Sequence, residues 1–355
     1  MKKTPLAALA AIAVTAAVAL TGCVAGEGTQ SASVTTPKPA ASGEKLGANG
    51  WSATTLNIDY ATYNPLSLIV KQQGYLEKAF GDKVKVNWVQ SAGSAAANQA
   101  LQAGAIDVGS TAGSAALLAR SNGTPIKTVD VYAQPDWSAI IVGKNSTITK
   151  VSQLKGKSIA AQQGTDPYFF LLQALAANKV PVSDVTIQNL PHANGKAALE
   201  NGSVDAWSGL DPLLTTSVLT AGSKNIYDHP AFNTYGFLNA TESFLQKSPD
   251  LAQAVVDAYE KARAYAQAHP SDTAKILAQV AGISNDVATQ TMKRTNLAVS
   301  PVPGADQTKV LKVVGPVLVS SNAVQGGQPA VDTALKSLYD TTFITKADPK
   351  DLPNQ

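Results

Sequence analysis

The sequence predicts an α/β protein with two lobes. From residue 54 to about residue 222, short apolar segments of strand character alternate with segments of helical periodicity, a pattern typical of mostly parallel sheets covered by helices. The alternation breaks twice, at residues 134–139 and 233–241, which suggests that the chain crosses between lobes twice. The region after the N-terminal segment has about 300 residues, enough for two domains of ordinary size.

The elements follow one another in a regular order. The expected strands are residues 54–61, 83–89, 106–110, 126–133, 139–143, 158–162, 184–190 and 204–209. The expected helices are residues 65–80, 94–104, 114–123, 167–179, 195–202 and 212–222. After about residue 240 the pattern is almost purely helical, with an apolar stripe at helical spacing formed by Leu251, Val255, Ala258, Ala262 and Tyr265. We therefore predict two Rossmann-like lobes, one from residues 54–136 and 238–345 and the other from residues 137–237.

The composition is that of a globular protein with few charges. Hydrophobic residues make up 45% of the chain and charged residues 15%, and the net charge is +3. Because Lys2 and Lys3 belong to the N-terminal segment, the rest of the chain is close to neutral. We see no basic patch and expect no nucleic-acid partner.

The first residues are typical of an export signal. Two lysines precede an apolar stretch, and Leu20-Thr21-Gly22-Cys23 resembles a bacterial lipobox. We predict a signal peptide over residues 1–22, lipidation of Cys23, and a flexible tether over residues 23–53, which are rich in Gly, Ser, Thr, Ala and Pro. Cys23 is the single cysteine, so an internal disulfide is excluded. The protein is expected outside the cytoplasm, lipid-anchored to the cell membrane.

Several predicted helices begin with small or hydroxyl-bearing residues directly after a strand. Ser110 and Thr111 lie in a run without large side chains, between the strand at 106–110 and the helix at 114–123. Ligands of open α/β sheets bind at this edge, where helix N-termini offer free N–H groups and a positive dipole end. Ser110 and Thr111 are therefore candidate donors to an anion, or they simply cap the helix. Asn64, before Pro65, is expected as another helix N-cap.

Signals for other chemistry are few. His192, His229 and His269 are scattered, and no metal site, cofactor motif or phosphate loop is evident. Residues 109–113 have the spacing of a nucleophile elbow with Thr111 at the centre, which leaves a secreted hydrolase as a remote alternative. The protein is expected not to be an enzyme.

Three segments carry a resemblance to a known family. They are LKGKSIAAQQGT at residues 154–165, IDVGSTAG at 106–113 and NGSVDAWSGLDP at 201–212. They resemble solute-binding proteins of ABC importers for aliphatic sulfonates, taurine and nitrate, which are type II periplasmic binding proteins. The resemblance implies two α/β lobes joined by a two-crossover hinge, with the ligand in the cleft between them.

The resemblance also implies site residues. Ser110 and Thr111 match the family's donors in the first lobe, and Gln163, Gly164 and Thr165 match its helix-start donors in the second. Trp207 and Asp211 match a segment beside the cleft. Tyr63 and Asn64 lie where the first strand meets the first helix, which the family also uses. The predicted ligand contacts are thus Tyr63, Asn64, Ser110, Thr111, Gln163, Gly164, Thr165, Trp207 and Asp211, together with Asp136, Trp137 and Asp166.

Asp166 departs from the family pattern, which has small hydroxylated residues there. A carboxylate beside an anion is unfavourable unless a cation separates them, and the sequence shows no Arg or Lys convincingly placed in the cleft. Asp166 is therefore either a helix N-cap before Pro167 or, with Asp136 or Asp211, a partner for a ligand amine. Trp137 and Trp207 either stack on the ligand or pack in the core.

The predicted function is capture of a small sulfonate-like anion or zwitterion for an ABC importer. Its partners would be the ligand, a membrane permease, and the membrane through the lipid on Cys23, and the protein is expected to be a monomer. Two alternatives remain besides the hydrolase. The same scaffold would bind an amine-containing or heterocyclic metabolite through Asp136, Asp166 and Asp211, or it would serve as an anchored receptor for a protein.

Overall fold

The computed structural model describes residues 46–352. The predicted signal peptide at 1–22, the lipidation site Cys23 and most of the predicted tether at 23–53 lie outside the described residues. The described residues all belong to one unit, residues 37–355, by the contacts between their Cα atoms. Within residues 46–352, no helix is both long enough and apolar enough to cross a bilayer.

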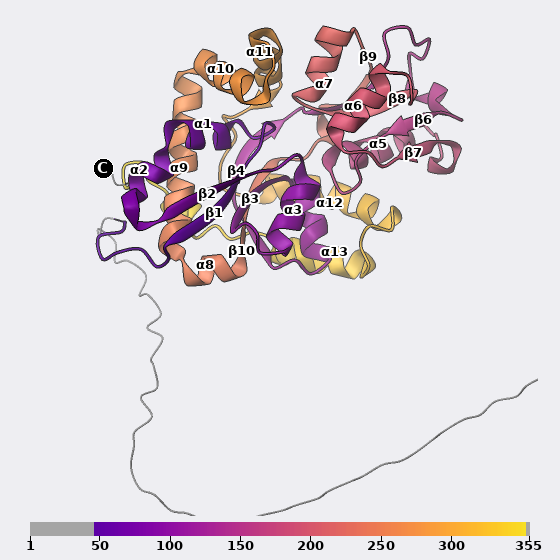
Figure 1. The fold of residues 1–355 in the computed structure, drawn as a ribbon. Coiled ribbons are helices and arrows are strands. Elements are labelled where there is room, and N and C mark those ends of the chain that lie inside the picture. The colour runs from indigo at the N-terminus through magenta and orange to yellow at the C-terminus, as the bar shows by residue number, and fades with distance from the viewer. Residues whose placement is uncertain (1–45, 353–355) are drawn as a thin grey trace, which may run out of the picture. The chain divides into compact units, whose positions relative to one another are not determined.

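A six-stranded mixed sheet is formed by strands from two separate stretches of this unit, one at its beginning and one after residue 235 (Figure 1). Its strands, in spatial order, are β11 (Thr295–Asn296), β4 (Ile126–Pro135), β10 (Gly236–Thr241), β3 (Val108–Ala112), β1 (Thr55–Tyr60) and β2 (Lys85–Gln90). β1 pairs in parallel with β2 and β3, as the βα alternation predicts. β10 runs antiparallel between β3 and β4.

A five-stranded sheet is formed by the stretch between β4 and β10. Its strands, in spatial order, are β7 (Thr186–Gln188), β6 (Ser158–Ala160), β8 (Ala206–Leu210), β5 (Ser138–Val142) and β9 (Lys224–Asp228). β6 is parallel to β7 and β8, whereas β5 is antiparallel to β8 and β9. Both sheets therefore have an antiparallel strand inserted among parallel ones, β10 in the first and β5 in the second, and the first sheet also has the antiparallel edge strand β11.

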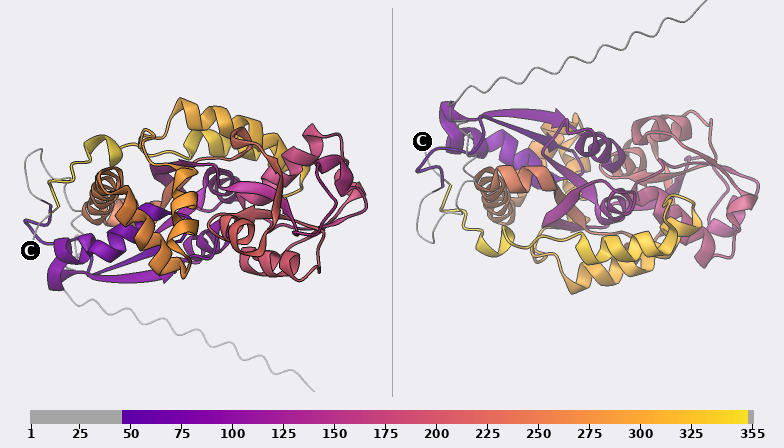
Figure 2. Two further views of the ribbon diagram at one scale, coloured as in Figure 1. Left: turned by 90° about the horizontal axis from the view of Figure 1, so that it is seen from above. Right: turned by 90° about the horizontal axis from the view of Figure 1, so that it is seen from below.

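Helices cover both sheets (Figures 1 and 2). Those before β10 are α1 (Pro65–Gln73), α2 (Tyr75–Phe80), α3 (Ser94–Gln102), α4 (Gly113–Ser121), α5 (Asp166–Ala177), α6 (His192–Glu200) and α7 (Leu213–Thr216). Those after it are α8 (Glu242–Lys247), α9 (Pro249–Ala268), α10 (Pro270–Ala281), α11 (Asn285–Lys293), α12 (Ala305–Ser320) and α13 (Gly327–Ser337). The stripe predicted on α9 is mostly core, because Leu251, Val255, Ala258 and Ala262 are buried. α12 packs against both α4 and α5 and so touches helices of both sheets.

The segment at residues 233–241, where the periodicity breaks for the second time, contains β10, a central strand of the first sheet. The sequence pattern did not predict a strand there. β10 lies between two strands, and five of its six residues are buried, including Phe237 and Leu238. A strand buried on both faces has no alternation of polar and apolar residues, so the period-of-two signal is missing. The chain thus returns to the first sheet through this segment.

The corner between β3 and α4 explains the run of small residues. β3 continues to Ala112, and α4 begins at Gly113. A Cβ atom on Gly109 would lie 2.8 Å from Ile106 Cδ1, and one on Gly113 would lie 3.2 Å from Phe237 Cε2. Close packing beneath the corner therefore requires small residues there, independently of any ligand.

The α/β class with two helix-covered sheets, predicted from the alternation, is confirmed. The boundaries given for the two lobes remain a proposal. The strands of the two sheets support it, since those of the second sheet all lie between residues 138 and 228.

Candidate functional site

Asp59 organises the predicted residues at the end of β1. Its carboxylate accepts hydrogen bonds from the backbone N–H of Ser110, at 2.9 Å, and from the Ser110 hydroxyl, at 2.7 Å. Ser110 Oγ in turn accepts from Asn64 Nδ2, at 2.9 Å, while Tyr63 donates to the Ser110 carbonyl, at 2.9 Å. Burial raises the pKa of Asp59 to about 6, against the opposing effect of these donors.

This network gives Ser110 and Asn64 internal roles. Both side chains are fully buried, and Asn64 is the N-cap of α1, where its Oδ1 accepts from Ser67 N at 3.3 Å. The predicted cap is thus confirmed. Ser110 lies inside β3, three residues before the helix it was expected to open. Its hydroxyl is occupied by Asp59, so in this arrangement it is not a free donor at a helix N-terminus.

Thr111 is likewise inside β3 and fully buried. Its hydroxyl donates to the Ala112 carbonyl, at 3.0 Å, and accepts from Asn239 Nδ2, at 2.7 Å. Neither partner is a general base, so Thr111 lacks the activating neighbour that a nucleophile needs. The expectation of a hydroxyl at the start of a helix was wrong for Thr111, because the strand extends to Ala112.

The N-termini of four helices contact one another in a closed circuit, those of α3 and α4 from the first sheet and those of α5 and α6 from the second. We call this set the N-terminus cluster, and its members are residues 93–94, 112–114, 162–166 and 192. The α3 and α4 starts are joined because Ala112 N donates to Ser94 Oγ, at 2.9 Å. The α4 and α5 starts are joined by a hydrogen bond from the Ser114 hydroxyl to Asp166.

The circuit closes through the fourth helix. The α5 and α6 starts are joined because His192 N donates to Gln162 Oε1, at 3.2 Å. The α6 and α3 starts touch, since a Cβ on Gly93 would lie 3.0 Å from His192 Cδ2. Each helix start carries a partial positive charge and N–H groups without an acceptor inside the helix. The circuit therefore brings four positive helix ends together, which favours an anion. In the structure the N–H groups of Ala112, Gly113, Ser114 and His192 have acceptors within the chain, so an anion would have to replace some of these acceptors.

Asp166 is the carboxylate of the N-terminus cluster. Besides Ser114, its donors are Trp137 Nε1 at 2.9 Å, Thr234 N at 2.7 Å and the Thr234 hydroxyl at 2.8 Å. Trp137 and Thr234 lie on the two crossovers between the sheets, so Asp166 ties both to the start of α5. Burial raises the pKa of Asp166, while these donors oppose the shift.

The structure corrects the N-cap prediction for Asp166, whereas its role as a partner for a ligand amine stays a prediction. The N-cap of α5 is Thr165, and Asp166 is the first residue of the helix. Asp166 is 2% exposed, and the bonds to Ser114, Trp137 and Thr234 already occupy its oxygens, so it has no free face for a ligand amine in this arrangement.

The other predicted residues of this loop lie within the cluster. Gln163 is exposed and donates its N–H to Asn189 Oδ1, at 2.9 Å, while the Thr165 hydroxyl donates to the Gln162 carbonyl, at 2.6 Å. Gly164 has φ +76°, a conformation that favours glycine. Of the three, Gln163 alone is exposed to solvent.

His192 was not predicted as a site residue. It is 2% exposed, and neither Nδ1 nor Nε2 has a hydrogen-bond partner among residues 46–352. Burial lowers the pKa of His192 to about 4, so the imidazole is neutral at physiological pH. The signal was its position: Pro191 and His192 follow a predicted strand, as the other corner residues do. Scattered histidines gave no reason to prefer this one.

Arg294 is a second residue that the sequence did not reveal. It follows α11 and forms ion pairs with three carboxylates, which are Asp211 at 3.1 Å, Asp228 at 3.0 Å and Asp136 at 3.5 Å. Burial raises the pKa of Asp136 to about 6, and Arg294 opposes that shift. The guanidinium of Arg294 therefore balances the negative charges of Asp136 and Asp211 within the chain. This arrangement does not support the alternative that these carboxylates bind a ligand amine.

The two tryptophans occupy different places. Trp137 is 3% exposed, donates to Asp166, and lies edge-on to Tyr63 with ring centroids 6.2 Å apart. Trp207 is fully buried in β8, and a Cβ on Gly195 of α6 would lie 2.7 Å from its Nε1. Trp207 thus packs beneath α6 as a core residue, while Trp137 borders the N-terminus cluster.

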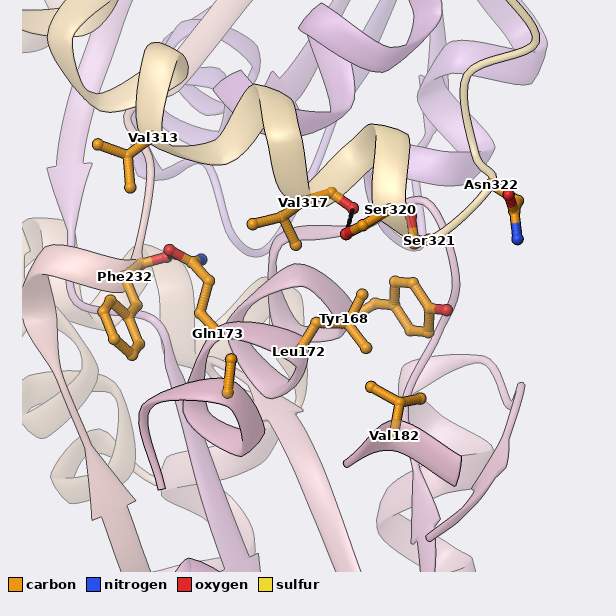
Figure 3. Close-up of a pocket in the computed structure, with 11 residues that line it drawn as sticks. Tyr168, Leu172, Gln173, Val182, Phe232, Val313, Val317, Ser320, Ser321 and Asn322 are labelled. Atoms are coloured by element: carbon orange, nitrogen blue, oxygen red, sulfur yellow. Dashed lines mark hydrogen bonds between the residues drawn. The ribbon is translucent and has the colours of Figure 1, made fainter. Parts of the chain in front are cut away.

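A groove of about 500 Å³ lies elsewhere, between α5 and α12 (Figure 3). Its lining residues are Tyr168, Leu172, Gln173, Ala176, Val182, Phe232, Val313, Val317, Ser320, Ser321 and Asn322. None of these was predicted as a site residue, and the lining carries no charged side chain. Among the described residues there is also no group of acidic, histidine or cysteine side chains able to hold a metal ion.

Comparison with known proteins gives one family. Residues 66–273 match the family described as NMT1/THI5 like. A protein of Escherichia coli (strain K12) that bears the name "Putative aliphatic sulfonates-binding protein" is 29% identical over 65% of this chain and 73% of its own length.

Two solved structures are similar in fold. One is the alkanesulfonate-binding protein SsuA from Xanthomonas axonopodis pv. citri bound to MOPS, with a TM-score of 0.70 and 26% identity over 77% of this chain and 94% of that one. The other is the periplasmic aliphatic sulphonate binding protein SsuA from Escherichia coli, with a TM-score of 0.68 and 24% identity over 82% and 93% of the two chains. These relatives are named for binding solutes, as expected of a protein that is not an enzyme. The chain belongs to the NMT1/THI5-like family and has the fold of its periplasmic sulfonate-binding relatives.

Proposed function

We propose that this protein is the solute-binding component of an ABC importer and that it captures a small sulfonate, or a zwitterion containing one. The observation that carries the proposal is the N-terminus cluster, in which four helix starts from the two sheets meet. A sulfonate has three oxygens that accept hydrogen bonds and one delocalised negative charge. Several converging N–H donors with partial positive charges therefore suit a sulfonate better than one cationic side chain would.

The proposed binding mode relies on separation and approach of the two lobes. In the structure the lobes are in contact at the cluster, where Gly93 meets His192 and Ser114 meets Asp166. Ligand entry requires these contacts to open, and closure around the ligand would expel water and strengthen each hydrogen bond. The closed form would then be presented to the membrane permease.

The remaining parts of the proposal come from the sequence. Export through residues 1–22, lipidation of Cys23 and the tether to residue 53 would hold a monomeric protein at the outer side of the cell membrane. Incorporation of labelled palmitate into the native chain, and its loss in Cys23→Ser, tests the anchor. An unlabelled native chain would contradict it.

The test of the ligand class is a thermal-shift and calorimetric screen on the folded protein. We use ethanesulfonate, taurine and MOPS, with nitrate, bicarbonate and an alkylamine for comparison and sodium chloride at equal ionic strength as the control. A ligand that binds the folded state raises the melting temperature by mass action. We expect shifts with the sulfonates that exceed the chloride control, and none with the amine. A shift with the amine alone would refute the proposal.

A further inference from the structure

The N-terminus cluster already contains a buried carboxylate, that of Asp166, and the proposed function does not explain how an anionic ligand binds beside it. Asp166 accepts hydrogen bonds only from neutral donors, which are Ser114, Trp137 and Thr234. A sulfonate bound in the same cluster would add a second negative charge. Helix N-termini contribute partial charges of about half a unit each, but two neighbouring anions in a region with little water repel one another strongly. A full positive charge close to the ligand would offset this repulsion.

His192 is the basic side chain in this position. It opens α6, and its backbone N–H and ring carbon contact Gln162 and Gly93 of the neighbouring helix starts. Both ring nitrogens are buried without a partner within the described part of the chain. A buried polar atom without a hydrogen-bond partner is unfavourable, so a side chain with two such atoms is unusual in a purely structural position.

The two residues that contact the ring and the backbone N–H of His192 carry no charge, and burial alone shifts its pKa. Gly93 and Gln162, from the elements packed against its ring, are uncharged. On α6 itself, one turn along, Lys196 is paired with Glu200 at 2.9 Å. Asp166 belongs to the same cluster, but its oxygens bond to Ser114, Trp137 and Thr234 instead. The imidazole is thus held neutral by burial and has no carboxylate partner to stabilise its charged form.

We propose that His192 is the residue that binds the anionic head of the ligand, and that its imidazole takes up one proton when the ligand binds. This inference rests on the proposed function. In the free protein the ring is neutral and has one N–H. With a sulfonate between the starts of α3 and α6, an N–H of the ring donates to a sulfonate oxygen, and the negative charge stabilises the protonated ring. The incoming proton comes from solvent, and no bond of the ligand is broken.

Proton uptake gives the affinity a defined pH dependence. Because binding raises the proton affinity of His192, ligand binding strengthens as the pH falls through the pKa of the complex and weakens as the pH rises through it. The slope is at most about tenfold in Kd for each pH unit, since one proton is involved. Ethanesulfonate is a suitable probe, because it stays ionised throughout this range.

The test is calorimetric titration of ethanesulfonate in buffers of different ionisation enthalpy, from about pH 5 to about pH 8. The variants are His192→Gln, which keeps an N–H donor but cannot be protonated, and His192→Leu. His269→Gln is the matched control, since His269 is exposed at the end of α9. We expect proton uptake in the native protein and in the control. We expect none in His192→Gln, with Kd at least about tenfold weaker near pH 6.

Stability separates a ligand contact from a structural role. Replacing a buried side chain without hydrogen-bond partners by an apolar one removes an unfavourable burial, so His192→Leu should melt at or above the native temperature while binding weakly. Native binding without proton uptake, or unchanged affinity and uptake in His192→Gln, would overturn the inference. A native protein that binds none of the sulfonates at any pH would instead refute the proposed function itself.

Discussion

Asp166 shows how far a single residue can be interpreted from sequence. Its departure from the family pattern marks it as unusual, and its place before Pro167 correctly indicates a helix start. Its partners could not be inferred, because Ser114 and Thr234 lie 52 and 68 residues away along the chain. Which side chains meet across two crossovers is decided by tertiary packing, which no local pattern encodes.

Asp166→Asn tests the value of this carboxylate to the fold. An asparagine would place an NH₂ group against donors that now point to a carboxylate oxygen, so at least one donor would lose its acceptor. We expect a loss of about 2–4 kcal/mol in the free energy of unfolding, measured by urea denaturation. Asp332→Asn on the exposed face of α13 is the control and should change stability by about 0.5 kcal/mol or less. Equal effects of the two substitutions would contradict the role assigned to Asp166.

Asp257, in α9, gives a pH prediction at the same scale. It is 1% exposed, and burial raises its pKa from 3.8 to about 7. The folded protein therefore holds this proton more tightly than the unfolded chain does. This contribution to stability is complete below about pH 3.8 and is lost as the pH rises through about 7.

Asp257→Asn removes the titrating group and keeps an oxygen for Gln253 and for the Asp348 N–H, at 3.0 and 3.1 Å from Oδ1. We expect the variant to be more stable than the native protein at about pH 8, by about 1–2 kcal/mol, with the difference vanishing near pH 4. Urea unfolding across this range measures it, and other titrating groups cancel in the difference. A constant difference at all pH values would show that the pKa of Asp257 is unchanged by folding.

At the scale of elements, the sequence predicted helix starts better than strand ends. Asn64 is the cap it was expected to be, because capping depends on residues within one turn. β3, in contrast, extends two residues beyond its expected end, so Thr111 belongs to a strand. Whether a run of small residues continues a strand depends on the neighbouring strand, here β10, which pairs with β3 up to Ala112.

Gly93 gives a prediction about how the starts of α3 and α6 meet. A Cβ on this residue would lie 3.0 Å from His192 Cδ2, closer than ordinary packing allows. Gly93→Ala should therefore hinder closure and weaken ethanesulfonate binding by about 1 kcal/mol, or about fivefold in Kd, measured by calorimetry.

The control for this substitution is Gly143→Ala, where the added Cβ would have Leu199 O at 3.9 Å, an ordinary contact. Its affinity should equal that of the native protein. If Gly93→Ala binds ethanesulfonate as tightly as the control does, then the contact between the two helix starts has no part in closure.

At the scale of the whole described chain, Arg294 ties the later helices to the second sheet. It lies directly after α11, whereas Asp211 directly follows β8 and Asp228 is the last residue of β9. The alternation and its two breaks predicted the architecture and the crossovers. The sequence could not place Arg294, because one arginine in a helical region has nothing local to distinguish it.

Arg294→Met tests this tie. Three carboxylates would lose their shared cation, and their mutual repulsion should lower the free energy of unfolding by about 1–2 kcal/mol at neutral pH, since the pairs are partly exposed. The loss should shrink as the pH falls from neutral to about 4, because burial raises the pKa of Asp136 to about 6 and this carboxylate loses its charge over that range. Lys275→Met, which breaks an exposed pair with Asp272, should change stability by about 0.5 kcal/mol or less. A loss that persists unchanged at pH 4 would have another cause.

The position of β10 has a consequence for the order in which the molecule can be assembled. β3 and β4 do not pair with each other, because β10, at residues 236–241, lies between them and pairs with both. The second sheet, by contrast, has all five strands within residues 138–228. A chain that emerges from its N-terminus can therefore complete the later sheet while the earlier one still waits for its middle strand.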